Sequence, residues 1–221
     1  MFRQETWRKM SRGPQIITLK DAGLISAFTG LQSGDTAVDA GAGSGFLAAY
    51  LGSVVAPGGK VTSYESRKEF AEIARRNVEK AGLQKVVEIK EKDILEGIGE
   101  KNVDLITFDM PNTENVLEHA KGALKENGFI VGYFPNVEQV KKFVEKAEEL
   151  KLKHVRTIEG TIREWLIRSY GCRPDNTGII FTGFLVFLRK ISEHEFEREK
   201  KEEEMTKAGR RHARGRKTLS H

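Results

Sequence analysis

The chain has 221 residues, of which 38% are hydrophobic and 31% charged, and this composition suits one globular domain with appended segments. The longest apolar run, residues 178–188, is too short to cross a bilayer, and the first residues contain no apolar signal-peptide core. The only cysteine, Cys172, excludes an intrachain disulfide. We therefore expect a cytoplasmic protein with no membrane partner.

The net charge of +5 is concentrated at the two ends of the sequence. Residues 1–20 carry five basic and one acidic side chain, and residues 191–221 carry nine basic and seven acidic ones, whereas residues 21–190 are almost neutral. Basic ends favour a polyanionic partner, because phosphates attract them and released counterions add affinity. Charged termini that only keep a protein soluble are an equally good reading. We expect a basic segment at 1–20, one domain at 21–190, and a charged tail at 191–221 that becomes basic at its end.

Short apolar segments alternate with helical patterns from residue 36 onward. The apolar segments are rich in Val, Ile and Phe, as buried parallel strands are, and occupy residues 36–40, 60–65, 86–90, 103–109 and 129–134. The segments between them have apolar residues at helical spacing and occupy residues 67–81, 114–125 and 137–150. This alternation predicts an α/β fold with a doubly wound, mostly parallel sheet.

The C-terminal part of the domain departs from this alternation. Residues 154–159 and 179–189 both have strand patterns, and no helical pattern lies between them. The second strand contains Gly183, where a bend or bulge is expected. An antiparallel strand pair that closes one edge of the sheet is the simplest arrangement.

The strongest motif is the glycine-rich segment at residues 38–45, Val-Asp-Ala-Gly-Ala-Gly-Ser-Gly. It follows a strand and opens a helix, so Gly41, Gly43 and Gly45 allow a ligand to approach the backbone at the carboxyl edge of the sheet. A dinucleotide-binding loop needs a glycine at position 46, where this chain has Phe46. The pattern resembles motif I of class I methyltransferases; a tight structural turn is the alternative.

Carboxylates stand at or just after the carboxyl ends of three of the predicted strands. Glu65 lies about 20 residues past the glycine loop, where an acidic side chain accepts hydrogen bonds from ribose hydroxyls. Asp93 is placed to accept a hydrogen bond from an adenine amino group. Asp109, followed by Pro111, ends a central strand, where a carboxylate stabilises positive charge that develops on a base. Glu65 could instead be a solvated cap of the next helix, and Asp109 could be a plain cap at the end of its strand.

Together these residues resemble the tRNA adenine-N1 methyltransferases that modify the T-loop, especially the archaeal members. The resemblance covers residues 10–190. It is carried by residues 9–10 with 12–21, the glycine loop, residues 63–65, residues 104–111 with 116–120, and a C-terminal block that contains 163–165, 173–174, 182–185 and 189–190. Members of that family usually have an N-terminal β-rich subdomain before the first of these stretches, where this sequence has about ten residues.

The resemblance implies S-adenosylmethionine as cofactor and an adenine at position 57 or 58 of tRNA as acceptor. It implies that the cofactor is held by residues of the glycine loop and of the following strand ends, Gly41, Gly43, Ser44, Gly45, Phe46, Leu47, Glu65, Ser66, Asp93, Ile94 and Asp109. Asp109 matches the catalytic aspartate of that family. Arg173, Pro174 and Thr182 match positions near the target base. The family forms homotetramers.

Several alternatives remain open at this point. A methyltransferase of the same fold can act on another RNA, on an isoaspartyl protein or on a corrin precursor. A non-catalytic RNA-binding subunit would be expected to lose the glycine loop, Glu65 and Asp109, all of which are present. A nicotinamide dehydrogenase is disfavoured by Phe46. No metal site is expected, because the five histidines show no ligand spacing with Cys172.

Overall fold

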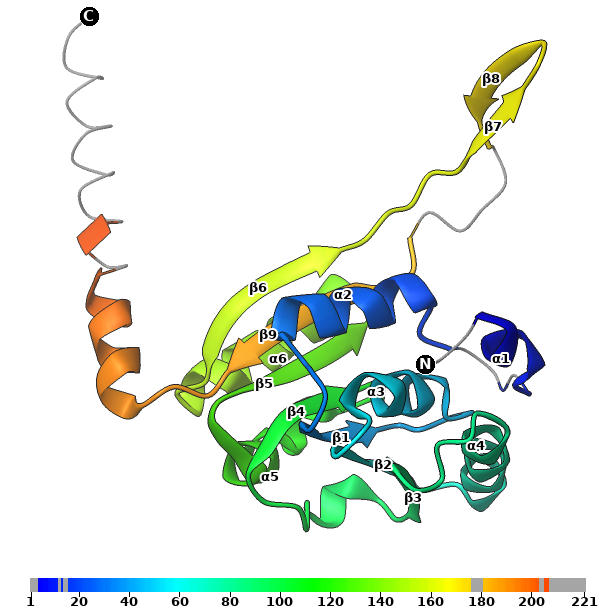
Figure 1. The fold of residues 1–221 in the computed structure, drawn as a ribbon. Coiled ribbons are helices and arrows are strands. Elements are labelled where there is room, and N and C mark those ends of the chain that lie inside the picture. The colour runs from blue at the N-terminus through cyan, green and yellow to red at the C-terminus, as the bar shows by residue number, and fades with distance from the viewer. Residues whose placement is uncertain (1–3, 12, 14–15, 176–180, 203–204, 207–221) are drawn as a thin grey trace, which may run out of the picture.

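The computed structural model describes residues 4–11, 13, 16–175, 181–202 and 205–206. Its centre is a seven-stranded sheet with the order β3-β2-β1-β4-β5-β9-β6 (Figure 1). The strands are β1 (Thr36–Ala40), β2 (Lys60–Glu65), β3 (Val87–Glu91), β4 (Val103–Phe108), β5 (Leu124–Phe134), β6 (Lys153–Glu159) and β9 (Phe184–Arg189).

The pairing of the strands confirms the expected doubly wound, mostly parallel sheet. Strands β1 to β5 pair in parallel, and β9 runs antiparallel to both of its neighbours, β5 and β6. The chain order reverses between β1 and β4, so the two halves of the sheet diverge at this point. Ligands of open α/β sheets bind in the crevice at such a reversal, outside the carboxyl ends of the strands.

Alternate side chains of the strands enter two separate hydrophobic clusters, one on each face of the sheet. Leu105 and Phe187 pack beneath α2 (Leu19–Thr29), α3 (Phe46–Val55) and α4 (Lys68–Lys80). Ile106 and Val186 pack against α5 (Leu117–Ala123) and α6 (Val137–Glu149) on the other face. The near-continuous apolar character of these strands follows from this burial on both faces.

Three expected elements differ from the observed ones by more than two residues at one end. The strand expected at 129–134 is β5, which begins five residues earlier, at Leu124. The helix expected at 114–125 is shorter, because η2 (Thr113–Asn115) precedes α5 and strand β5 already begins at Leu124. The strand expected at 179–189 begins at Phe184; residues 181–183 are not part of it, and residues 179–180 lie outside the described residues. Gly183 therefore precedes the strand, where it packs against the ring of Tyr133.

A two-stranded hairpin, β7 (Trp165–Arg168) with β8 (Gly171–Pro174), stands between β6 and β9, where no regular element was expected. The hairpin projects away from the central sheet, as Figure 1 shows. Its exposed side chains include Trp165, Ile167 and Tyr170. A hairpin this short is marginally stable alone in water, so exposed apolar side chains on it suggest a further contact surface.

The two ends of the described chain pack on different parts of the domain. Near the N-terminus, α1 (Gln4–Lys9) places Trp7 edge-to-face on Phe46, with ring centroids 4.5 Å apart. Near the C-terminus, residues 193–202 are helical and are bound by the ion pairs Lys153–Glu199 and Lys200–Glu148. The basic end of the tail at 207–217 lies outside the described residues. Among the helices that the structure describes, none is long and apolar enough to span a membrane.

Candidate active site

A cavity of about 370 Å³ opens at the carboxyl ends of β1, β2 and β4. Among the residues expected to hold a cofactor, six line it: Gly41, Glu65, Ser66, Asp93, Ile94 and Asp109. The remaining lining residues are Tyr64, Arg67, Lys92, Leu95, Met110, Pro111 and Asn112. The structure thus brings together residues that are up to 71 positions apart in the sequence, from Gly41 to Asn112, at the place where the strand order of the sheet reverses.

Gly41 forms the floor of the cavity, and no larger residue fits there. Its φ angle is +86°, and a Cβ atom at this position would lie 2.2 Å from the backbone oxygen of Asp109. The loop is fixed to the sheet because the backbone N–H groups of Gly41 and Ala42 both donate to the carbonyl oxygen of Tyr64. The absence of a side chain at Gly41 therefore allows the end of β1 to lie directly against the backbone that follows β4.

The Glu65 carboxylate lies beside the loop. Its Oε2 atom accepts a hydrogen bond of 2.8 Å from the backbone N–H of Gly43, and its Oε1 atom accepts one of 2.9 Å from Nε of Arg67. The hydrogen bond to Glu65 raises the pKa of the Arg67 guanidinium, which also stacks over the ring of Phe70 at 4.0 Å. The carboxylate is thus oriented before any ligand arrives, and sequence reasoning did not find the contribution of Arg67.

Asp93 and Ile94 line the cavity just after the carboxyl end of β3. The Asp93 carboxylate accepts a hydrogen bond of 2.9 Å from the backbone N–H of Leu95 and caps the short helix η1 (Ile94–Glu96). Ile94 is buried beneath it. The three carboxylates at 65, 93 and 109 therefore border one continuous cavity.

Asp109 is the most perturbed acid in the cavity. Burial, followed by the negative charge of Asp39, raises the pKa of its carboxyl group to about 7. Asp39 itself is fully buried between Ser63 and Thr107, whose hydroxyl groups donate to it at 2.6 and 2.8 Å. Burial raises the pKa of Asp39 as well. A strongly perturbed acid in a cleft is typical of a functional site.

The other residues expected at the cofactor lie next to the cavity without lining it. Ser44 is buried and its hydroxyl accepts a hydrogen bond of 2.6 Å from the backbone N–H of Gly13. Gly45 packs closely on Ala74 of α4, and Phe46 and Leu47 are buried in the hydrophobic clusters. The side chains of Ser44, Phe46 and Leu47 are therefore buried in the protein and do not line the cavity.

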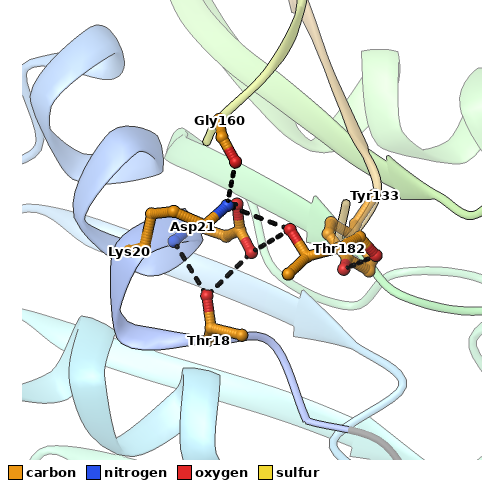
Figure 2. A network of polar contacts seen from close by, with 6 residues as sticks. All are labelled: Thr18, Lys20, Asp21, Tyr133, Gly160 and Thr182. Atoms are coloured by element: carbon orange, nitrogen blue, oxygen red, sulfur yellow. Dashed lines mark hydrogen bonds and ion pairs between the residues drawn. The ribbon is translucent and has the colours of Figure 1, made fainter. Parts of the chain in front are cut away.

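The three residues expected near a target base are not brought together. Arg173 and Pro174 lie on β8 of the projecting hairpin, where the guanidinium of Arg173 donates to the carbonyl oxygen of Pro174. Thr182 lies at the base of that hairpin segment, and its side chain points toward Lys20 and Asp21 (Figure 2). Sequence reasoning treated Lys20 only as part of a basic segment and assigned no role to Asp21, which is fully buried.

No group of three or more potential metal ligands occurs among the residues that the structure describes. The chemistry of the cavity instead comes from carboxylates, backbone N–H groups and a glycine floor. Such an arrangement suits an organic cofactor with hydroxyl and amino groups.

Comparison with known proteins identifies the family. Residues 4–216 match the family model described as tRNA methyltransferase complex GCD14 subunit. The chain belongs to this methyltransferase family. A relative in Methanocaldococcus jannaschii, tRNA (adenine(57)-N(1)/adenine(58)-N(1))-methyltransferase TrmI, is 38% identical over 208 residues, with 82% of this chain and 74% of the relative covered.

Two solved structures share the fold. A SAM-dependent O-methyltransferase from Thermotoga maritima has a TM-score of 0.80 and 33% identity, over 85% of this chain and 71% of that one. The tRNA (m1A58) methyltransferase TrmI from Aquifex aeolicus has a TM-score of 0.79 and 26% identity, over 87% and 76%. The membership of the GCD14 family and these two likenesses agree that the protein is a methyltransferase. The two similar proteins, an O-methyltransferase and an m1A58 methyltransferase, are named for different acceptor atoms.

Proposed function

We propose that this protein transfers a methyl group from S-adenosylmethionine to N1 of an adenine in the T-loop of tRNA, at position 57 or 58. The observation that carries the proposal is the cavity in which Gly41, Glu65 and Asp109 meet. The TrmI name of the 38% identical relative supports the choice of acceptor.

The residues around the cavity fit S-adenosylmethionine. The buried carboxylate of Glu65 has the charge and the position to accept hydrogen bonds from the two ribose hydroxyls. Asp93 is an acceptor for the adenine amino group, and Ile94 offers an apolar surface to the ring. The part of the cavity lined by Gly41 and Asp109 is available for the methionine part.

The acceptor chemistry explains why the cavity contains an acid and no nucleophile–base pair. When bound, S-adenosylmethionine supplies an electrophilic methyl group, and its transfer leaves a positive charge on the adenine. Adenine N1 carries a lone pair at neutral pH, so no residue needs to remove a proton before transfer. The Asp109 carboxylate accepts a hydrogen bond from the exocyclic amine, orients the base and stabilises the positive charge.

The partner and the assembly belong to the same proposal. The basic ends of the sequence suit tRNA, whose T-loop adenine has to leave the stack to reach a cavity. We propose a homotetramer, as the family resemblance implies, and the exposed Trp165, Ile167 and Tyr170 of the hairpin offer an apolar contact surface for it. We place the enzyme in the cytoplasm, with its exposed Cys172 reduced.

The deciding experiment is mass spectrometry of nucleosides from a T-loop tRNA transcript incubated with the enzyme and S-adenosylmethionine. We expect 1-methyladenosine at position 57 or 58. A matched transcript with guanosine at both positions controls for other sites. A protein that binds S-adenosylmethionine but leaves the tRNA unmodified would disprove the acceptor and leave the cofactor assignment standing.

A further inference from the structure

The segment that contains the hairpin leaves and rejoins the sheet at two adjacent points. Glu159 at the end of β6 pairs with Phe184 at the start of β9, so Gly160 and Gly183 flank the whole excursion. A Cβ atom on Gly160 would lie 3.2 Å from Nζ of Lys20, and one on Gly183 would lie 2.6 Å from the ring of Tyr133. Both ends of the segment are therefore packed closely on other elements.

The ammonium group of Lys20 connects both ends of this segment to α2. It donates hydrogen bonds to Oδ1 of Asp21 at 2.5 Å, to the carbonyl oxygen of Gly160 at 2.7 Å and to Oγ1 of Thr182 at 2.9 Å (Figure 2). An ammonium group has three protons, so these three acceptors use all of them.

Asp21 and Thr182 complete the network. Oδ2 of Asp21 accepts from the hydroxyl of Thr182 at 2.9 Å and from the hydroxyl of Thr18 at 2.8 Å. Asp21 is fully buried, and the side chain of Lys20 is 14% exposed. The hydroxyl of Thr182 therefore accepts one hydrogen bond and donates another, and both partners belong to the protein. We call Lys20, Asp21, Thr182 and the carbonyl group of Gly160 the α2 cluster.

The α2 cluster adjoins the proposed acceptor side of the active site through Tyr133. The Tyr133 hydroxyl donates a hydrogen bond to the backbone oxygen of Thr182. Burial, with smaller effects of the negative charges of Asp21 and Asp109, raises the pKa of Tyr133 to about 12. Phe108 on β4 pairs with Gly132 on β5. Asp109 and Tyr133 are the next residues along these two neighbouring strands. Tyr133 thus lies between the α2 cluster and Asp109.

We infer that the α2 cluster positions Thr182, Tyr133 and the base of the hairpin segment beside Asp109, and thereby sets the affinity for the acceptor base. This inference rests on the proposed function. Lys20, Asp21 and Thr182 act as positioning residues, since their polar groups bind one another and the backbone. The cofactor cavity lies over β1, β2 and β4, whereas the α2 cluster lies over β5, β6 and β9, so the two can be perturbed separately.

Thr182→Val is the most selective variant, because valine has the shape of threonine and the Lys20–Asp21 ion pair stays in place. Removing Asp21 would instead leave a buried ammonium group without its counter-charge. We expect the KM for tRNA to rise about tenfold, as for the loss of buried hydrogen bonds, while the affinity for S-adenosylmethionine changes less than about twofold. Thr182→Ser should restore the tRNA KM, because it returns the hydroxyl group.

Gly160→Ala tests the same cluster without removing a polar group. The added Cβ would lie 2.7 Å from Cδ1 of Leu24 and 3.2 Å from Nζ of Lys20, so both side chains have to shift. Gly122→Ala on α5 is the matched control, because a Cβ there meets nothing within 4 Å. We expect a raised tRNA KM for the first variant only. An unchanged tRNA KM for both Thr182→Val and Gly160→Ala would overturn the inference.

Amide hydrogen exchange of the whole protein separates this inference from the proposed function. In Thr182→Val, the paired amides of Trp165–Arg168 and those near Gly160 should exchange faster than in the parent, while those of β1 and β2 do not. If the parent leaves tRNA unmethylated, the proposed acceptor is wrong, and the exchange of these amides still decides the cluster: unchanged exchange contradicts the positioning role.

Discussion

The carboxyl groups of Asp39 and Asp109 interact unfavourably across the end of the sheet, and this repulsion adds to the effect of burial on Asp109. Asp39 cannot move away, because Ser63 on β2 and Thr107 on β4 both donate hydrogen bonds to it. Its register partners in the two flanking strands are these same residues. The buried acid of β1 therefore adjusts the acid–base behaviour of the residue that we assign to catalysis.

The first prediction concerns pH. With a pKa of about 7, the Asp109 carboxyl is neutral below that pH and charged above it. Since the charged form stabilises the methylated base, single-turnover methylation should increase as the pH rises through about 7 and be lost as it falls. Asp39→Asn removes a negative charge, so the profile should shift to lower pH. A parent profile that is already flat from pH 5 upward would contradict this assignment.

The second prediction is that Asp109→Ala reduces turnover roughly 10²–10⁴-fold, the range for a positioned acid–base or charge-stabilising side chain. Calorimetry should show that S-adenosylmethionine still binds. Asp104→Ala is not a suitable control, because Asp104 forms an ion pair with Lys125 and accepts a hydrogen bond from the backbone of Thr36. Glu118→Ala, an exposed change on α5 beyond the cavity, is expected to retain the parent turnover. Full activity of Asp109→Ala would remove Asp109 from the mechanism.

The third prediction concerns the ribose contact. Glu65→Gln should weaken S-adenosylmethionine binding by about 1.5–3 kcal/mol, the range for a hydrogen bond to a charged group. Glu88→Gln is the control, because Glu88 lies half exposed on β3 and forms an ion pair with Lys60 away from the cavity. Calorimetry at constant pH measures both. Equal affinities of the parent and Glu65→Gln would place the ribose elsewhere.

The sequence predicted the strand ends of the active site well, and the physical reason is simple. Parallel strands that are buried on both faces have a continuous apolar pattern, and their carboxyl ends meet at one edge. Glu65, Asp93 and Asp109 each follow such a strand, so their meeting at one cavity could be expected from the order of the elements. The functional assignments of these residues remain predictions.

Side-chain direction and distant contacts could not be read in the same way. Phe46 and Leu47 follow the glycine motif directly, yet the first turn of α3 directs Phe46 toward Trp7, a residue 39 positions earlier. Thr182 is bound to residues more than 160 positions away. The strands of the hairpin β7–β8 are too short for an alternating pattern of apolar and polar residues to distinguish them from a loop. Lys20 and Asp21 lie inside a stretch that carries the family resemblance. That resemblance was the only sign in the sequence that the pair has a role.

The last prediction concerns Asn77, which joins the N-terminal segment to the glycine loop. Its buried side-chain amide accepts from the backbone N–H of Ser11 and donates to the carbonyl oxygens of Ser11 and Ser44, each at 2.8 Å. In Asn77→Ala these backbone groups lose their partner, at a cost of roughly 1–3 kcal/mol in the free energy of unfolding. Denaturant unfolding measures this change.

Asn77→Ala should also weaken S-adenosylmethionine binding, because Ser44 belongs to the loop that carries Gly43 beside Glu65. Lys80→Ala is the control: Lys80 donates to the hydroxyl of the same Ser11 from an exposed position, so its loss should leave cofactor affinity at the parent value. If Asn77→Ala lowers stability while the cofactor binds as before, the N-terminal segment stabilises the fold without shaping the loop. If both quantities fall together, the docked segment contributes to the cofactor site, because its position and that of the loop depend on the same buried amide.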